Sequence, residues 1–171
     1  MIYLPSHLQG EDSGVSLAVL ALVAWFVMIV FALVPKGLTL TDIVFLYFLI
    51  GILTITLFTV FDVNLRWATL TRTVEGSFAM YICRFIVIPL HILMSVSVLN
   101  SDLTKKWKGV LFGTILLSLC ANDQIYLGLD LITFRRWNEG YSALMYAAFM
   151  FGIWSITRWF IVLDRGGLKE P

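Results

Sequence analysis

Four ionisable side chains stand within long apolar runs of this chain or at their edges: Arg84, His91, Asp123 and Asp130. A charged residue at the centre of a bilayer costs at least about 2.5–3.5 kcal/mol, so such residues are kept with a partner or for a task. An arginine and a carboxylate can pair and so fix the register of two helices. They can also line a site for an anion, a proton or a small ligand, and a carboxylate or histidine can transfer protons in catalysis.

The runs that carry these residues indicate an all-α integral membrane bundle. The 171 residues are 60% hydrophobic and 13% charged, with a mean hydropathy of +0.90, whereas soluble domains carry about 25% charged residues. A helix needs about 20 apolar residues to cross roughly 30 Å of hydrocarbon. The sequence therefore predicts one transmembrane domain over residues 1–171 in the lipid bilayer. Its five expected helices span residues 15–34, 43–61, 77–99, 109–132 and 141–163.

Basic residues in the connections predict the orientation. Residues 1–14 contain no Lys or Arg and carry Glu11 and Asp12, so the first run is interpreted as a retained span, since a signal peptide begins with basic residues. With the N-terminus outside, six basic residues (Lys36, Lys105, Lys106, Lys108, Arg165 and Lys169) face inward and four (Arg66, Arg72, Arg135 and Arg136) face outward. The positive-inside rule then predicts the N-terminus outside and the C-terminus inside.

In this orientation the third and fourth spans bring their polar residues to similar depths. Arg84 lies about 10–12 Å below the outer end of its helix, and Asp123 about 13 Å below the outer end of the next. Consecutive spans are expected to be neighbours, so the two residues are predicted to pair. His91 follows Arg84 by seven residues and Asp130 follows Asp123 by seven, which places each pair on one helical face. The sequence predicts a polar seam that opens outward.

Three interpretations of this seam are open. Because polar side chains hold membrane helices together, a device that fixes helix register is favoured. A cavity for an anion, a proton or a small ligand comes second, and a catalytic site third. Against catalysis, Asp123 and Asp130 would lie roughly 10 Å apart on one helix, too far to share a proton.

The chain lacks other catalytic and cofactor signatures. It has neither the HExxH zinc motif nor the GxSxG nucleophile elbow of serine hydrolases. Its two histidines do not supply the facing pair that a haem would need. Cys83 and Cys120 form no CxxC motif, and they are expected to be unpaired thiols. The sequence thus predicts no enzyme, no metal and no cofactor, and the net charge of +1 suggests no nucleic-acid partner.

Small residues and loop charges suggest further contacts. Gly109 and Gly113 form a GxxxG pattern, which allows close helix packing, so other membrane proteins or a second copy of the chain are possible partners. The outer loops carry four acidic residues (Asp62, Glu75, Asp130, Glu139) and four basic ones (Arg66, Arg72, Arg135, Arg136). These charges are expected to neutralise one another in a cap over the bundle.

The C-terminal part of the chain resembles a known family. Asp123, the segment 136–143 (RWNEGYSA), the proline in Ile88-Pro89-Leu90 and the pair Leu99-Asn100 resemble a family of small multi-pass membrane proteins from Bacillus-type spore-forming bacteria. Asp123 stands where that family tends to have Glu. The resemblance implies a protein of the bacterial cytoplasmic membrane and no particular activity. The sequence therefore favours a non-enzymatic structural or accessory subunit, and the alternative is a small transport component with a ligand or proton site between the third and fourth spans.

Overall fold

The computed structural model describes residues 7–135 and 137–167, with side chains for 15–135 and 137–161. Five helices are long and apolar enough to cross a membrane, which confirms the predicted number and apolar character of the long helices. The elements are α1 (His7–Leu33), α2 (Leu40–Thr59), η1 (Val60–Asn64), β1 (Ala68–Leu70), α3 (Val74–Ile82), η2 (Cys83–Val87), α4 (Ile88–Asn100), α5 (Lys105–Gly128), β2 (Ile132–Phe134) and α6 (Glu139–Gly167).

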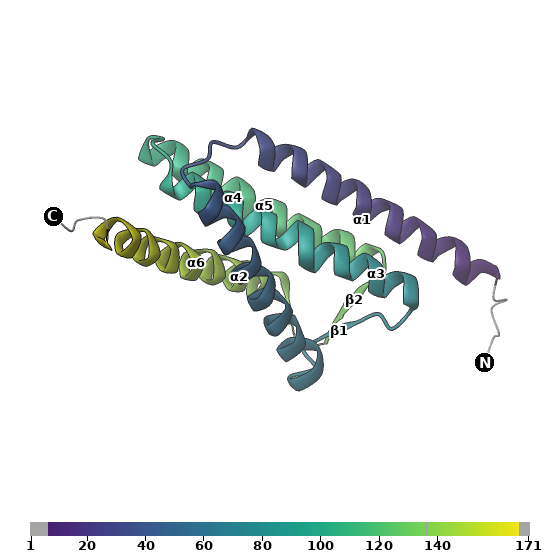
Figure 1. Ribbon diagram of the computed structural model, residues 1–171. Coiled ribbons are helices and arrows are strands. Elements are labelled where there is room, and N and C mark those ends of the chain that lie inside the picture. Colours follow the sequence, from purple (N-terminus) through teal and green to yellow (C-terminus); the bar gives the residue numbers. More distant parts are fainter. Residues whose placement is uncertain (1–6, 136, 168–171) are drawn as a thin grey trace.

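The third span is the core of the bundle. The elements α3, η2 and α4 form one continuous helix from Val74 to Asn100, and 72% of its apolar stretch is buried, against 22% to 28% in the other four spans. Helix α1 packs on α3, η2 and α4, α2 packs on η2 and α4, and α5 and α6 pack on α4 and on each other (Figure 1). Every residue from Ile88 to Val98 is buried. The other four long helices cover most of the surface of this span, so it forms the interior of the bundle.

A proline sets a local irregularity in this central helix. Pro89 has no N–H, so it cannot donate to the carbonyl of Phe85 four residues earlier. The segment η2 is π-helical, and Ile88 N–H bonds to Cys83 O, five residues back. The hydroxyl of Tyr47 in α2 donates to the free Phe85 carbonyl at 2.6 Å. A side chain of the second span thus satisfies the backbone group that Pro89 leaves without a donor, as a membrane environment requires.

Tyr47→Phe should therefore destabilise the bundle by about 1–2 kcal/mol, because the Phe85 carbonyl loses its hydrogen bond in an apolar environment. The matched control is the same change in a Pro89→Ala background. There the N–H of residue 89 can bond to Phe85 O, and the loss should shrink to a few tenths of a kcal/mol. Free energies of unfolding in detergent for the four proteins measure this. An equal loss in both backgrounds would show that Tyr47 does not stabilise through that carbonyl.

Two short strands close one end of the bundle. Strand β1 pairs antiparallel with β2, with Ala68 opposite Phe134 and Leu70 opposite Ile132. This sheet was not predicted, and the predicted extension of the fourth span to Ile132 is wrong, because α5 ends at Gly128. Asp130 then adopts a positive φ of 52°, a conformation that Asp tolerates better than most residues and that turns the chain into the strand.

Candidate functional site

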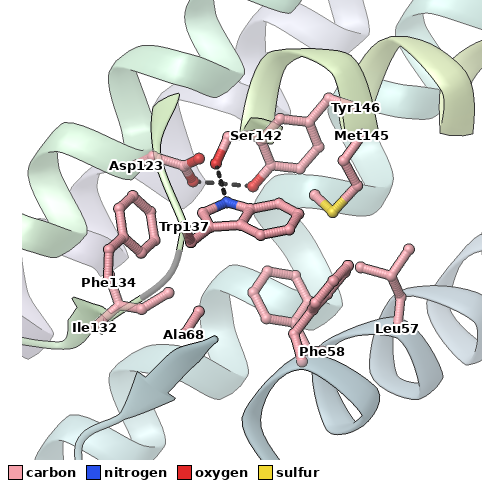
Figure 2. A pocket seen from close by; sticks show the side chains of 11 residues that line it. Leu57, Phe58, Ala68, Asp123, Ile132, Phe134, Trp137, Ser142, Met145 and Tyr146 are labelled. Atoms are coloured by element: carbon pink, nitrogen blue, oxygen red, sulfur yellow. Dashed lines mark hydrogen bonds between the residues drawn. The ribbon is translucent and has the colours of Figure 1, made fainter. Parts of the chain in front are cut away.

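The carboxylate of Asp123 lies inside the bundle near the end that carries the sheet. Asp123 is 5% exposed, and its Oδ1 accepts a hydrogen bond from the Tyr146 hydroxyl at 2.9 Å. Ser142 lies beside this carboxylate, and the indole Nε1–H of Trp137 donates to Ser142 Oγ at 2.8 Å (Figure 2). The fourth span therefore presents its acid to the fifth span, and not to the third as predicted.

The start of α6 places these partners. Asn138 Oδ1 accepts the backbone N–H of Tyr141 at 2.9 Å, which satisfies one of the free N–H groups of the first turn. Ser142 and Tyr146 are four residues apart on one face of the helix. Both are buried, and Met150 and Ile153 continue the same buried face. Two polar positions of this buried α6 stripe, Ser142 and Tyr146, thus lie beside Asp123, and Thr157 is a further buried polar residue towards its other end.

A small cavity lies beside the carboxylate, with a volume of about 20 Å³. This is enough for one water-sized group, which needs about 10–15 Å³ on the same measure. Helix α2, both strands, the chain before α6 and α6 itself contribute to its wall (Figure 2). Its polar residues are Asp123, Ser142 and Tyr146, and its aromatic residues besides Tyr146 are Phe58, Phe61, Phe134 and Trp137.

The predicted pair of Arg84 and Asp123 does not form. The guanidinium of Arg84 lies over the ring of Phe58, with Cζ 4.9 Å from the ring centre. Its Nε and Nη2 atoms are enclosed and have no hydrogen-bond partner. The π-helical segment η2 contains Arg84, and the side chain lies against α2 instead of α5. Position along the helix axis does not fix the direction in which a side chain leaves the helix, and this direction sets the partner of Arg84.

His91 lies at the interface between α4 and α5. It is 2% exposed, its Nδ1 lies 2.8 Å from Val87 O, and its Nε2 lies 2.9 Å from Ser118 Oγ. Since a carbonyl can only accept, Nδ1 carries the hydrogen and the Ser118 hydroxyl donates to Nε2. Both ring nitrogens are therefore engaged in hydrogen bonds, and His91 links the third and fourth spans. Among the described residues, no hydrogen bond connects His91 to the cavity beside Asp123.

Asp130 is exposed and follows the end of α5, so it does not continue the face of Asp123. The predicted seam of Arg84, His91, Asp123 and Asp130 is therefore wrong as a single site: these side chains occupy four separate environments. The predicted charge cap is present only in part. Among the described residues, Arg72 and Asp62 form the one ion pair, at 3.4 Å.

The residues that surround Asp123 were not predicted as a site. The signal that could have pointed to them is the spacing of Ser142 and Tyr146, two polar side chains four residues apart in the first half of the fifth span. Membrane helices keep such residues on faces that are buried in protein. The contributions of Phe58, Phe61 and the strands have no local signal, since they depend on how loops distant in the sequence meet.

Comparisons with protein-family models, with curated proteins and with solved structures find no match to this chain. The resemblance to the family from spore-forming bacteria consequently stays a prediction. The geometry around Asp123 is therefore the feature that indicates a function for this chain.

Proposed function

We propose that this protein is a non-enzymatic component of a transport system in the bacterial cytoplasmic membrane, and that it binds a small monovalent cation at Asp123. The observation that carries the proposal is a buried carboxylate that lines a cavity and has no basic partner among the residues whose side chains are described. A role in helix register depended on the pair with Arg84, which does not form. The site lies among the second, fourth and fifth spans, in place of the third and fourth.

The chemistry of the cavity favours a cation. A carboxylate supplies a full negative charge in a region of low dielectric, where charge interactions are strong. Aromatic faces attract cations through the ring quadrupole, and Phe58, Phe61, Phe134 and Trp137 provide several such rings. The hydroxyl of Tyr146 donates to the Asp123 carboxylate, which holds the acid in place, and Ser142 lies beside it in the cavity wall.

The size of the cavity limits the ligand. A volume of about 20 Å³ admits an ion of about the size of water, such as ammonium or sodium, and excludes bulky organic cations unless the wall opens. One part of the cavity wall lies outside the long helices and consists of the two strands and the loop before α6. We propose that a ligand enters on this side.

Titration calorimetry of the purified full chain in detergent tests the proposal. Ammonium and sodium chloride are compared with choline chloride at equal ionic strength, and a saturable signal is expected for at least one small ion and not for choline. Asp123→Asn keeps the shape of the side chain and removes its charge, so it should weaken binding about tenfold or more, the effect of losing ~1.4 kcal/mol.

Asp130→Asn is the matched control, because it removes a carboxylate of the same type that is exposed outside the cavity; binding should be unchanged. If neither small ion binds, or if both variants weaken binding equally, the proposal is wrong and Asp123 serves packing alone. The orientation with the N-terminus outside belongs to the same proposal. A reporter fused to the C-terminus should be active in the cytoplasm.

A further inference from the structure

A second cavity lies at the same end of the bundle, on the other side of Phe58. Its volume is about 140 Å³, and its lining includes Arg84, Arg72, Asp62 and Tyr81. Phe58 separates the two cavities, because its ring lines the first and lies under the guanidinium of Arg84. The second cavity is several times larger than the space one water molecule needs and has a different charge, since two guanidinium groups face one carboxylate.

Arg84 has hydrogen-bond donors to spare. A guanidinium has five N–H groups and no acceptor, and both Nε and Nη2 of Arg84 are enclosed without a partner. Leaving a charged donor unsatisfied in a protein interior costs more than leaving a neutral one unsatisfied. The stack on Phe58 offsets part of this cost through the face of the guanidinium. Its edge, where the N–H groups lie, is the part that binds oxyanions.

The carboxylate in the cavity does not meet this need. Asp62 accepts the Leu70 backbone N–H at 3.2 Å and is paired with Arg72 at 3.4 Å, and its side chain is 10% exposed. It lies close enough to act on Arg84 electrostatically, yet no hydrogen bond joins them in the described chain. Arg72 is 79% exposed, so most of its donors are open. Donors therefore exceed acceptors in this cavity, and the lining has a net charge of +1.

We propose that Arg84 and Arg72 bind a phosphate-type oxyanion in this cavity. Several acceptor oxygens on one group match the guanidinium forks, and charge-assisted bonds of this kind are roughly twice as strong as neutral ones. Tyr81 precedes Arg84 by about one turn and lies on the same helical face. Its exposed side chain adds a hydroxyl at the rim of the cavity. The oxyanion is either inorganic phosphate or the phosphodiester of an anionic lipid, which would reach the cavity along the exposed Tyr81 and Phe85.

The test uses the full chain after delipidation. Native mass spectrometry counts retained phosphatidylglycerol against phosphatidylcholine, and calorimetry in detergent measures the binding of inorganic phosphate. Binding of phosphate alone assigns the site to the free ion, and selective retention of phosphatidylglycerol assigns it to the lipid; either result supports the proposal. If wild type binds neither probe, the proposal is overturned.

Variants locate the site. Arg84→Gln should weaken binding about tenfold or more, and Arg72→Gln, on an exposed loop where folding is not at risk, should weaken it several-fold. Arg158→Gln is the matched control, because Arg158 also lies over an aromatic ring, that of Trp154, but lines neither cavity; binding should not change. Asp123→Asn should also leave phosphate binding unchanged, which keeps this test separate from that of the cation site. Equal losses in Arg84→Gln and Arg158→Gln would overturn the proposal.

Discussion

Exchanging the two intramembrane charges, in the double variant Arg84→Asp with Asp123→Arg, is expected not to restore the fold that either single change disrupts. Asp123 is 5% exposed and bonded to Tyr146, so an arginine there is a buried charge without a partner. Losing one side of a buried polar contact in this way costs about 3–5 kcal/mol. Arg84→Asp removes the stack on Phe58 and brings a second carboxylate near Asp62.

A pair that served helix register would behave differently, because the exchanged charges would attract each other again. The coupling energy from the four unfolding free energies separates the two cases. Since no salt bridge joins the residues, we expect a value below about 1 kcal/mol, in the range of weakly coupled sites. Recovery of most of the lost stability in the double variant would instead show that Arg84 and Asp123 act as a pair.

Gly37→Ala should clearly lower the stability of the fold, because it adds a methyl group at a crowded position in the loop between α1 and α2. A Cβ at this position would lie 2.5 Å from both the carbonyl carbon and the carbonyl oxygen of Asn100. These are backbone atoms at the end of α4, so they cannot turn aside as a flexible side chain would. The loop between α1 and α2 would have to move off the central helix, at a cost of about 2–3 kcal/mol.

Gly51→Ala is the matched control for this change. Gly51 lies in the middle of α2, where an added Cβ would meet no atom within 4 Å. Alanine is the better helix former by up to about 1 kcal/mol, so the variant should be as stable as wild type or more so. Thermal unfolding of both variants in the same detergent gives the comparison. Similar behaviour of the two would mean that the contact between Gly37 and Asn100 is not maintained.

The positions of the membrane helices could be predicted because they depend on local composition. Each apolar run has about the length needed to span the hydrocarbon, and the second, third and fifth predicted spans agree with the helices to within about four residues at both ends. The first helix begins at His7, eight residues before the predicted start at 15. The end of the fourth was wrong because the helix stops at Gly128, and the apolar residues Leu129, Leu131 and Ile132 belong to the turn and the strand β2 that follow. Hydropathy does not distinguish a lipid-facing helix end from a strand that packs on its partner.

The candidate site was harder to predict. The sequence identified Asp123 as a charged residue that is costly to bury in an apolar span. Its partner, however, was assigned only from the depth of the two residues along their helices. Depth follows from the rise per residue, whereas the direction of a side chain depends on the rotation of each helix and on local irregularities. Here the π-helical segment around Arg84 and the contact of Tyr47 with Phe85 O are among the features that fix that rotation.

By itself, the sequence determined that this chain forms five helices long and apolar enough to span a membrane. It also determined that Arg84, His91 and Asp123 would need partners within them, because the cost of polar groups in an apolar interior applies to any arrangement. The tertiary structure alone decided which partners they have. Asp123 is bonded to Tyr146, His91 to Ser118, and Arg84 stacks on Phe58. These choices arise from the packing of four helices around a central one and from a sheet between distant loops, and no local pattern in the sequence encodes either.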